Sequence, residues 1–174
     1  MTDQSPLELG PMPSDRSMTV VDERLVRAPL ERVAGLAIDV ERWPALLEHY
    51  RYVRFSERRA DGGGIVAMSA DRPFGPIGWP TWWTSRMRVL RPESAPPSVR
   101  YTHVAGVTMG MDVEWTFEPR GEGTFVRIVH VWNGPPIPVL GPLVAGLIIG
   151  PVFVSGIASR TLAGLAREAE RVRA

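Results

Sequence analysis

Hydrophobic and polar residues alternate along several short segments in the middle of the chain. The alternation is clearest over 109–118, where five apolar side chains fall on one face: Met109, Met111, Val113, Trp115 and Phe117. Because side chains point alternately to the two faces of a strand, this period predicts a strand with one buried face. Similar segments at 51–60, 65–71, 81–90, 96–106 and 123–132 are joined by short connections containing glycine or proline. They predict an antiparallel meander, with the proline- and glycine-rich residues 72–80 as a loop.

The two ends of the chain carry different patterns. Residues 18–27 predict a first strand, and two short helical stretches follow at 29–39 and 40–50, each with a proline near its start. Near the other end, Leu162, Leu165, Ala169 and Val172 recur at spacings of three and four. This periodicity predicts a long amphipathic helix from Pro151 to about Val172.

These elements predict an α+β fold. A curved antiparallel sheet of about seven strands would wrap around the long C-terminal helix, with the two short helices after the first strand. Residues 1–17 are expected to form a disordered N-terminal segment and 18–174 a single domain.

The alternation also predicts which strand residues face the interior. Arginines and threonines on these strands are expected to face solvent, so the residues that alternate with them are expected to point inward. These are Trp83, Ser85, Met87, Val89, Val99, Tyr101, His103, Val126, Ile128, His130 and Trp132. Arg86 and Arg88 are then outward. Asp112, Glu114 and Glu118 are interpreted as a solvated edge.

Residues 131–159 contain no charged side chain. This tract is longer than the roughly 20 residues that cross a bilayer, so insertion into a membrane and shallow docking on its surface are both alternatives. Five prolines and five glycines within the tract argue against a membrane-spanning helix. The favoured interpretation is a buried lid that leads into the final helix.

The composition of the chain excludes several kinds of reactive group and binding site. The chain has 174 residues and a net charge of +1, which gives no field that would attract nucleic acid. It contains no cysteine and no lysine, which excludes thiolate nucleophiles, thiolate metal sites and Schiff bases. No metal-ligand cluster or nucleotide-binding loop is found, so no cofactor is expected, and the cytoplasm is the default compartment. Only His49, His103 and His130 can titrate near neutral pH.

Several segments resemble the START/SRPBCC superfamily, whose members share the helix-grip fold. Residues 23–54, with Trp43–Pro44, look like the superfamily's opening, and 83–92, 110–119, 123–132 and 158–172 are similar to its polyketide cyclase/dehydrase branch. The resemblance covers about residues 19–173. It implies a hydrophobic cavity between the curved sheet and the last helix.

Aromatase/cyclases of this branch fold and dehydrate a poly-β-ketone held on an acyl carrier protein. Their working pattern is an arginine, a histidine and, in some members, a helix acid. In this chain the histidine falls on His130, the arginine on Met87 and the acid near Thr161. Arg86 would replace the arginine only if the strand register slipped by one residue.

His130 and His103 are the candidate catalytic residues. They would lie on one face about 10 Å apart, on strands separated by another strand. The candidate ligand-binding residues are Trp43, Trp83, Ser85, Met87, Tyr101, Met111, Trp115, Trp132 and Thr161. For all of them an ordinary place in the core is the alternative. His49 is interpreted as a cation at the end of a helix.

Two functions remain open. The first is a polyketide cyclase that acts on an apolar chain, with His130 transferring protons and an acyl carrier protein as partner. The second is a non-catalytic carrier of a lipid, quinone or other apolar molecule, which Met87 favours. A ligand sensor is a third interpretation without direct support.

Overall fold

Seven strands form one antiparallel sheet in the computed structural model, which describes residues 11–74, 77–134 and 155–171. The strand order is β1-β7-β6-β5-β4-β3-β2, so the last strand returns beside the first. The strands are β1 (Met18–Val26), β2 (Tyr50–Arg58), β3 (Gly64–Phe74), β4 (Ile77–Leu90), β5 (Ser98–Gly106), β6 (Asp112–Arg120) and β7 (Gly123–Trp132). The predicted meander is confirmed for β2 to β7.

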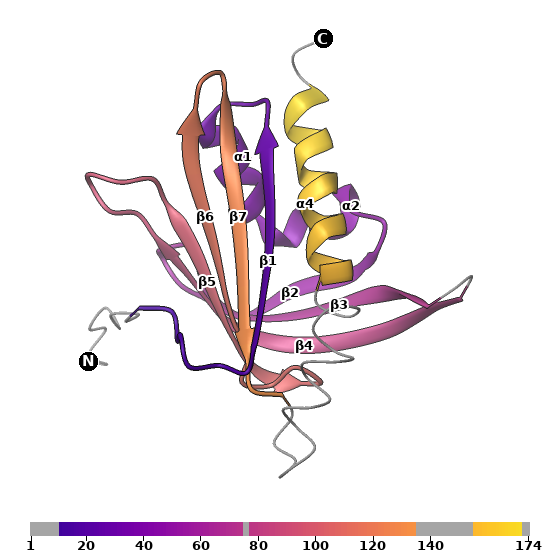
Figure 1. The fold of residues 1–174 in the computed structure, drawn as a ribbon. Coiled ribbons are helices and arrows are strands. Elements are labelled where there is room, and N and C mark those ends of the chain that lie inside the picture. The colour runs from indigo at the N-terminus through magenta and orange to yellow at the C-terminus, as the bar shows by residue number, and fades with distance from the viewer. Residues whose placement is uncertain (1–10, 75–76, 135–154, 172–174) are drawn as a thin grey trace.

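The sheet is strongly curved and holds the final helix on its concave side (Figure 1). Between β1 and β2 come α1 (Leu30–Ile38), the 3-10 turn η1 (Val40–Arg42) and α2 (Trp43–Leu46). The final helix, α4 (Ser155–Glu170), packs against β1, α1, β3 and α2. The α+β helix-grip architecture expected from the sequence is therefore confirmed.

The predicted inward faces of the strands and of the last helix agree with the burial of their side chains, but Arg88, which was predicted to point outward, is also buried. All eleven strand residues expected to point inward are buried except His103, which is half-buried. On α4, Leu162, Leu165 and Ala169 are buried. Met87 is fully buried while its neighbour Arg86 is exposed, so the register does not slip.

The hairpin of β3 and β4 is longer than predicted. Residues 72–74 and 77–80 were expected to form a loop, yet they continue the two strands, with Pro73 opposite Gly78 and Pro80 opposite Asp71. The prediction was wrong because proline is excluded only where its missing N–H breaks a ladder. Among the described residues, β2 pairs with β3 only as far as Ala70 and β5 pairs with β4 only as far as Trp83, so neither strand extends the ladder beside this part of the hairpin.

Met109 was expected to share the inward face of the sixth strand, and this was wrong. The strand begins at Asp112, and Met109 lies in the preceding turn with its side chain 46% exposed. Gly106 and Gly110 flank this turn with positive φ angles of 95° and 84°, a conformation that favours glycine. The two glycines let the chain reverse direction before the strand starts.

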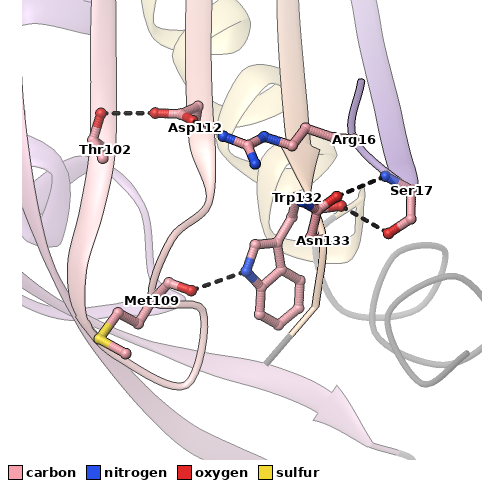
Figure 2. Close-up of polar contacts among 7 residues, drawn as sticks. All are labelled: Arg16, Ser17, Thr102, Met109, Asp112, Trp132 and Asn133. Carbon is pink, nitrogen blue, oxygen red and sulfur yellow. Dashed lines mark hydrogen bonds and ion pairs between the residues drawn. The ribbon is translucent and has the colours of Figure 1, made fainter. Parts of the chain in front are cut away.

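Contacts to the sheet begin before β1 (Figure 2). The Ser17 amide donates to Asn133 Oδ1 over 3.0 Å, and the Arg16 guanidinium lies 4.0 Å from the Asp112 carboxylate. Of the segment expected to be disordered, residues 1–10 lie outside the described residues. The proposed lid, the start at Pro151 and Val172 also lie outside them. Within the described ranges, no helix is long and apolar enough to cross a membrane.

Candidate functional site

A cavity lies between the concave face of the sheet and α4. Its volume is about 80 Å³. Its described lining comprises Trp43, Tyr50, Met68, Thr81, Trp83, Tyr101, His103, Val107, Thr108, Met111, Val113, Trp115, His130, Ile157, Ala158 and Thr161. No residue in this lining carries a formal charge, so the cavity is apolar with a few polar groups.

Eight of the eleven candidate site residues meet at this cavity. They are Trp43, Trp83, Tyr101, His103, Met111, Trp115, His130 and Thr161. The other three are Ser85, Met87 and Trp132, which are buried but are absent from the lining.

Trp132 acts on the cavity indirectly. Its indole Nε1–H donates to the carbonyl of Met109 over 2.9 Å (Figure 2). This bond ties the end of β7 to the turn between β5 and β6. The same turn supplies Val107 and Thr108 to the cavity lining, so Trp132 is a support for that wall.

Aromatic rings form a continuous row along one wall. Trp115 lies 5.8 Å from Trp43, and Trp43 lies 5.2 Å from Tyr50, measured between ring centroids. Tyr50 lies 6.4 Å from Trp83, which stacks on His103 at 6.0 Å. Contacts in this range stabilise aromatic pairs, so the row forms a wall that suits a flat apolar molecule.

The two cavity imidazoles are neutral at physiological pH. Burial lowers the pKa of His130 to about 3, and burial together with the nearby His130 lowers the pKa of His103 to about 3. His103 Nδ1 lies 2.6 Å from the Thr108 hydroxyl. The two histidines are on β5 and β7, separated by β6, as the strand order predicted.

Two buried polar atoms beside the cavity have no hydrogen-bond partner among the described residues. They are His130 Nδ1 and the hydroxyl oxygen of Tyr101. Burial, and secondarily Tyr50, raises the pKa of Tyr101 well above its usual value, so its hydroxyl keeps its proton and remains a donor. Because buried polar groups are nearly always paired, these two atoms are available to a ligand or to water.

His49 is not the helix-end cation that the sequence suggested. Its side chain is buried, and Nε2 lies 3.0 Å from the hydroxyl of Thr161 on α4. Burial, followed by the charges of Arg160 and Arg167, lowers its pKa to about 4. The helix dipole does not decide its state, because α2 ends at Leu46 and α4 covers the ring.

Sequence reasoning missed Tyr50, which supplies a hydroxyl to the cavity. It was assigned to the end of a helix, but it is the first residue of β2. An irregularity in the pairing between Tyr50 and Tyr52 breaks the alternation that would have revealed its facing. Thr108 was missed because it lies in a turn, where alternation gives no signal.

No group of three or more histidines or acids suited to a metal ion is found in the described ranges. The site therefore offers neutral imidazoles, neutral phenols and aromatic faces. These groups can hold a flat apolar molecule, and they can donate protons to the oxygen atoms of that molecule or accept protons from them.

Comparisons with known proteins agree with this fold. A protein of Streptomyces halstedii named "Putative polyketide cyclase" is 29% identical over 107 residues, which cover 61% of this chain and 93% of that protein. Among solved structures, the Zhui aromatase/cyclase of Streptomyces sp. R1128 matches 90% of this chain and 96% of its own, with a TM-score of 0.71 and 20% identity. A START superfamily protein of Mycobacterium smegmatis matches 88% and 98%, with a TM-score of 0.64 and 18% identity.

The structural matches show a shared fold, and a family model adds a sequence assignment. The model described as "Polyketide cyclase / dehydrase and lipid transport" matches residues 26–151, which is most of the chain. The chain therefore belongs to the polyketide cyclase/dehydrase and lipid transport family, in the START/SRPBCC group of helix-grip proteins.

Proposed function

We propose that this protein binds an apolar polyketide or acyl chain in the cavity and promotes its cyclisation and dehydration. The observation that carries the proposal is a pair of polar atoms without a hydrogen-bond partner among the described residues, His130 Nδ1 and the Tyr101 hydroxyl, beside a mainly apolar cavity. A poly-β-ketone supplies what these atoms lack, because its carbonyl oxygens accept hydrogen bonds and its acidic carbons release protons. Membership of the family supports the same reaction class.

The aromatic row would fold the chain, and the polar groups would move protons. Cyclisation forms one carbon–carbon bond, and His130 Nδ1 takes the proton from the attacking carbon. The attacked ketone oxygen accepts a hydrogen bond from Tyr101 and takes the proton held by His130, so it becomes a hydroxyl and the imidazole returns to its neutral form. In dehydration His130 takes a proton from the neighbouring carbon and passes it to the departing hydroxyl. The carbon–oxygen bond breaks, a carbon–carbon double bond forms, and water leaves.

The low pKa of His130 limits its strength as a base in the empty cavity. A developing enolate places negative charge beside the ring in a medium of low dielectric constant, which raises the pKa of the imidazole. With Met87 where related cyclases are expected to have an arginine, shape and proximity would supply most of the effect.

The direct test supplies the protein with a poly-β-ketone chain attached to an acyl carrier protein and measures the cyclised product. His130→Ala is expected to abolish product while it leaves affinity for an apolar ligand within about tenfold. Tyr101→Phe removes one hydroxyl from the cavity and is expected to reduce product, whereas Tyr52→Phe is the matched control, because Tyr52 is absent from the cavity lining. Unchanged turnover in His130→Ala would remove the enzymatic proposal.

An acyl carrier protein is the proposed partner, because it would deliver the chain. Its surface is acidic, and exposed arginines on the outer face of β4 would suit it. Arg86 is exposed and meets this requirement. Arg88 was expected to do the same, but its side chain is only 7% exposed, so we assign the contact to Arg86 alone.

A second candidate function is a non-catalytic carrier of a lipid, quinone or similar apolar molecule. The buried Met87 and the uncharged lining favour it, because no cation is present in the described lining to stabilise an enolate. A carrier would bind the ligand with unchanged affinity in His130→Ala and would yield no product even as the wild type.

A further inference from the structure

Outside the cavity, a polar groove runs between the 46–49 segment and α4. The volume of this groove is about 340 Å³. Its described lining comprises Leu46, Leu47, Glu48, His49, Arg160, Ala163, Gly164, Arg167, Glu168 and Arg171. The groove and the cavity share no lining residue, so the layer that contains His49 separates them.

Three side chains connect the two hollows through this layer. His49, from the groove, lies 3.0 Å from the Thr161 hydroxyl, which lies 3.3 Å from the Tyr50 hydroxyl. Thr161 and Tyr50 both line the cavity. The rings of His49 and Tyr50 also touch, with centroids 4.8 Å apart. All three side chains are buried.

The hydroxyl of Thr161 has one hydrogen and three neighbours. Besides His49 and Tyr50, it lies 2.8 Å from the carbonyl oxygen of Ile157, which can only accept. That carbonyl is the nearest acceptor and takes the hydrogen of Thr161, so the hydroxyl oxygen of Thr161 can only accept from His49 and Tyr50. When Nε2–H of His49 donates to this oxygen, the hydrogen of Tyr50 is not needed there and can point to a ligand oxygen in the cavity. When His49 does not donate, Tyr50 turns its hydrogen to the Thr161 oxygen instead.

We propose that His49 is a positioning residue for the cavity, which donates to Thr161 and thereby leaves the Tyr50 hydroxyl free to donate to a carbonyl oxygen of the bound ligand. This inference rests on the proposed function, because the direction of the Tyr50 hydrogen matters only when the cavity holds a ligand. It names the ligand feature that is recognised, a ketone oxygen at the Tyr50 end of the aromatic row.

The surroundings of His49 support a neutral ring. Arg160 and Arg167 face the ring from α4, and Asp71 on β3 is the opposing charge; burial and the arginines prevail and lower the pKa to about 4. A neutral imidazole has a single N–H. Thr161 supplies a partner for that hydrogen at Nε2.

Two ligands of nearly the same shape test the proposal. Methyl naphthyl ketone and the ethylnaphthalene of the same substitution pattern differ chiefly in one carbonyl oxygen, so the ratio of their affinities reports the hydrogen bond to that oxygen. His49→Leu is expected to lower the affinity for the ketone by about three- to tenfold and to leave that for the hydrocarbon unchanged. His49→Gln, whose amide nitrogen can donate near the position of Nε2, is expected to restore the ketone preference.

Two further variants separate positioning from a general loss of structure. Tyr50→Phe is expected to abolish the preference for the ketone. In a protein that carries Tyr50→Phe, adding His49→Leu is then expected to leave the affinity for the ketone unchanged, and a double-mutant cycle measures this. Thr161→Val removes the linking hydroxyl with little change in shape, and its effect is expected not to add to that of His49→Leu.

The outcomes also distinguish this inference from the proposed function. A wild type that binds neither naphthalene removes the proposed function. If the wild type binds both ligands, two results overturn the role of His49 and leave the proposed function standing. One is a ratio of ketone to hydrocarbon affinity that does not change in His49→Leu. The other is a failure of His49→Gln to restore that ratio.

Discussion

The imidazole of His103 lies nearly parallel to the indole of Trp83, with an interplanar angle of 19° and ring centroids 6.0 Å apart. The two residues are on adjacent strands, β5 and β4, at a point where the pairing shifts by one residue next to Ser85. The shift places Gly106 opposite Trp83, where an added Cβ would lie 2.5 Å from the carbonyl oxygen of Trp82. A glycine at 106 thus lets the strands approach, and the stacked pair forms the end of the aromatic row.

Replacing Trp83 tests whether this row binds flat ligands. Trp83→Phe retains an aromatic ring but loses part of the stacked area, so we expect the affinity for an ethylnaphthalene to fall by about two- to tenfold. Trp82→Phe is the matched control, because Trp82 is 53% exposed and is absent from the cavity lining. Isothermal titration calorimetry measures both, and equal losses in the two variants would contradict the assignment of this wall.

Alternation in the sequence predicted the strand faces because one side of this sheet is dry. A slip by one residue would have buried Arg86 and exposed Met87, so the register was strongly constrained. The pattern gave no information on turns or on long-range contacts. Thr108 reaches the cavity from a turn, and His49 becomes buried only because α4, more than a hundred residues later, covers it.

Pro73 and Pro80 led to the wrong prediction of a loop in a segment that forms paired strands. A proline within a segment argues against a central strand, but it does not exclude a hairpin that extends beyond its neighbours. Whether the neighbours end early depends on the lengths of β2 and β5, which no local pattern around Pro73 reveals. The pattern predicted which way a residue faces where it lay on a regular strand, and it missed Tyr50 at the start of β2 and Thr108 in a turn.

The three histidines make stability depend on pH. Each has a folded pKa well below the usual 6.5, about 3 for His103 and His130 and about 4 for His49. The unfolded chain therefore binds more protons than the folded chain between these values. Stability is fully present above about pH 6.5 and falls as the pH drops towards 4, by about 2 kcal/mol per histidine between about pH 7 and pH 5.

Urea denaturation at several pH values measures this dependence. The slope of the free energy of unfolding against pH near pH 5 is expected to correspond to about three protons, and His103→Gln is expected to reduce it to about two. As the control, Glu118→Gln is expected to change the slope near pH 5 by only a small fraction of a proton, because its carboxylate is mostly ionised at that pH in the unfolded chain and, beside Arg120, more so in the folded chain. A flat profile in the wild type would mean that the buried rings are already protonated or open to water.

Met87→Arg asks whether the arginine of the cyclase pattern can be introduced into this chain. Met87 is fully buried and absent from the cavity lining, so a guanidinium there would be a charge removed from water. We expect the substitution to destabilise the fold by about 3 kcal/mol or more. The reciprocal change one residue earlier, Arg86→Met, is the control, and because Arg86 is exposed its expected effect is within about 0.5 kcal/mol. If Met87→Arg proves as stable as the wild type and raises the yield of cyclised product, side chain 87 reaches the ligand and the carrier function loses its main support.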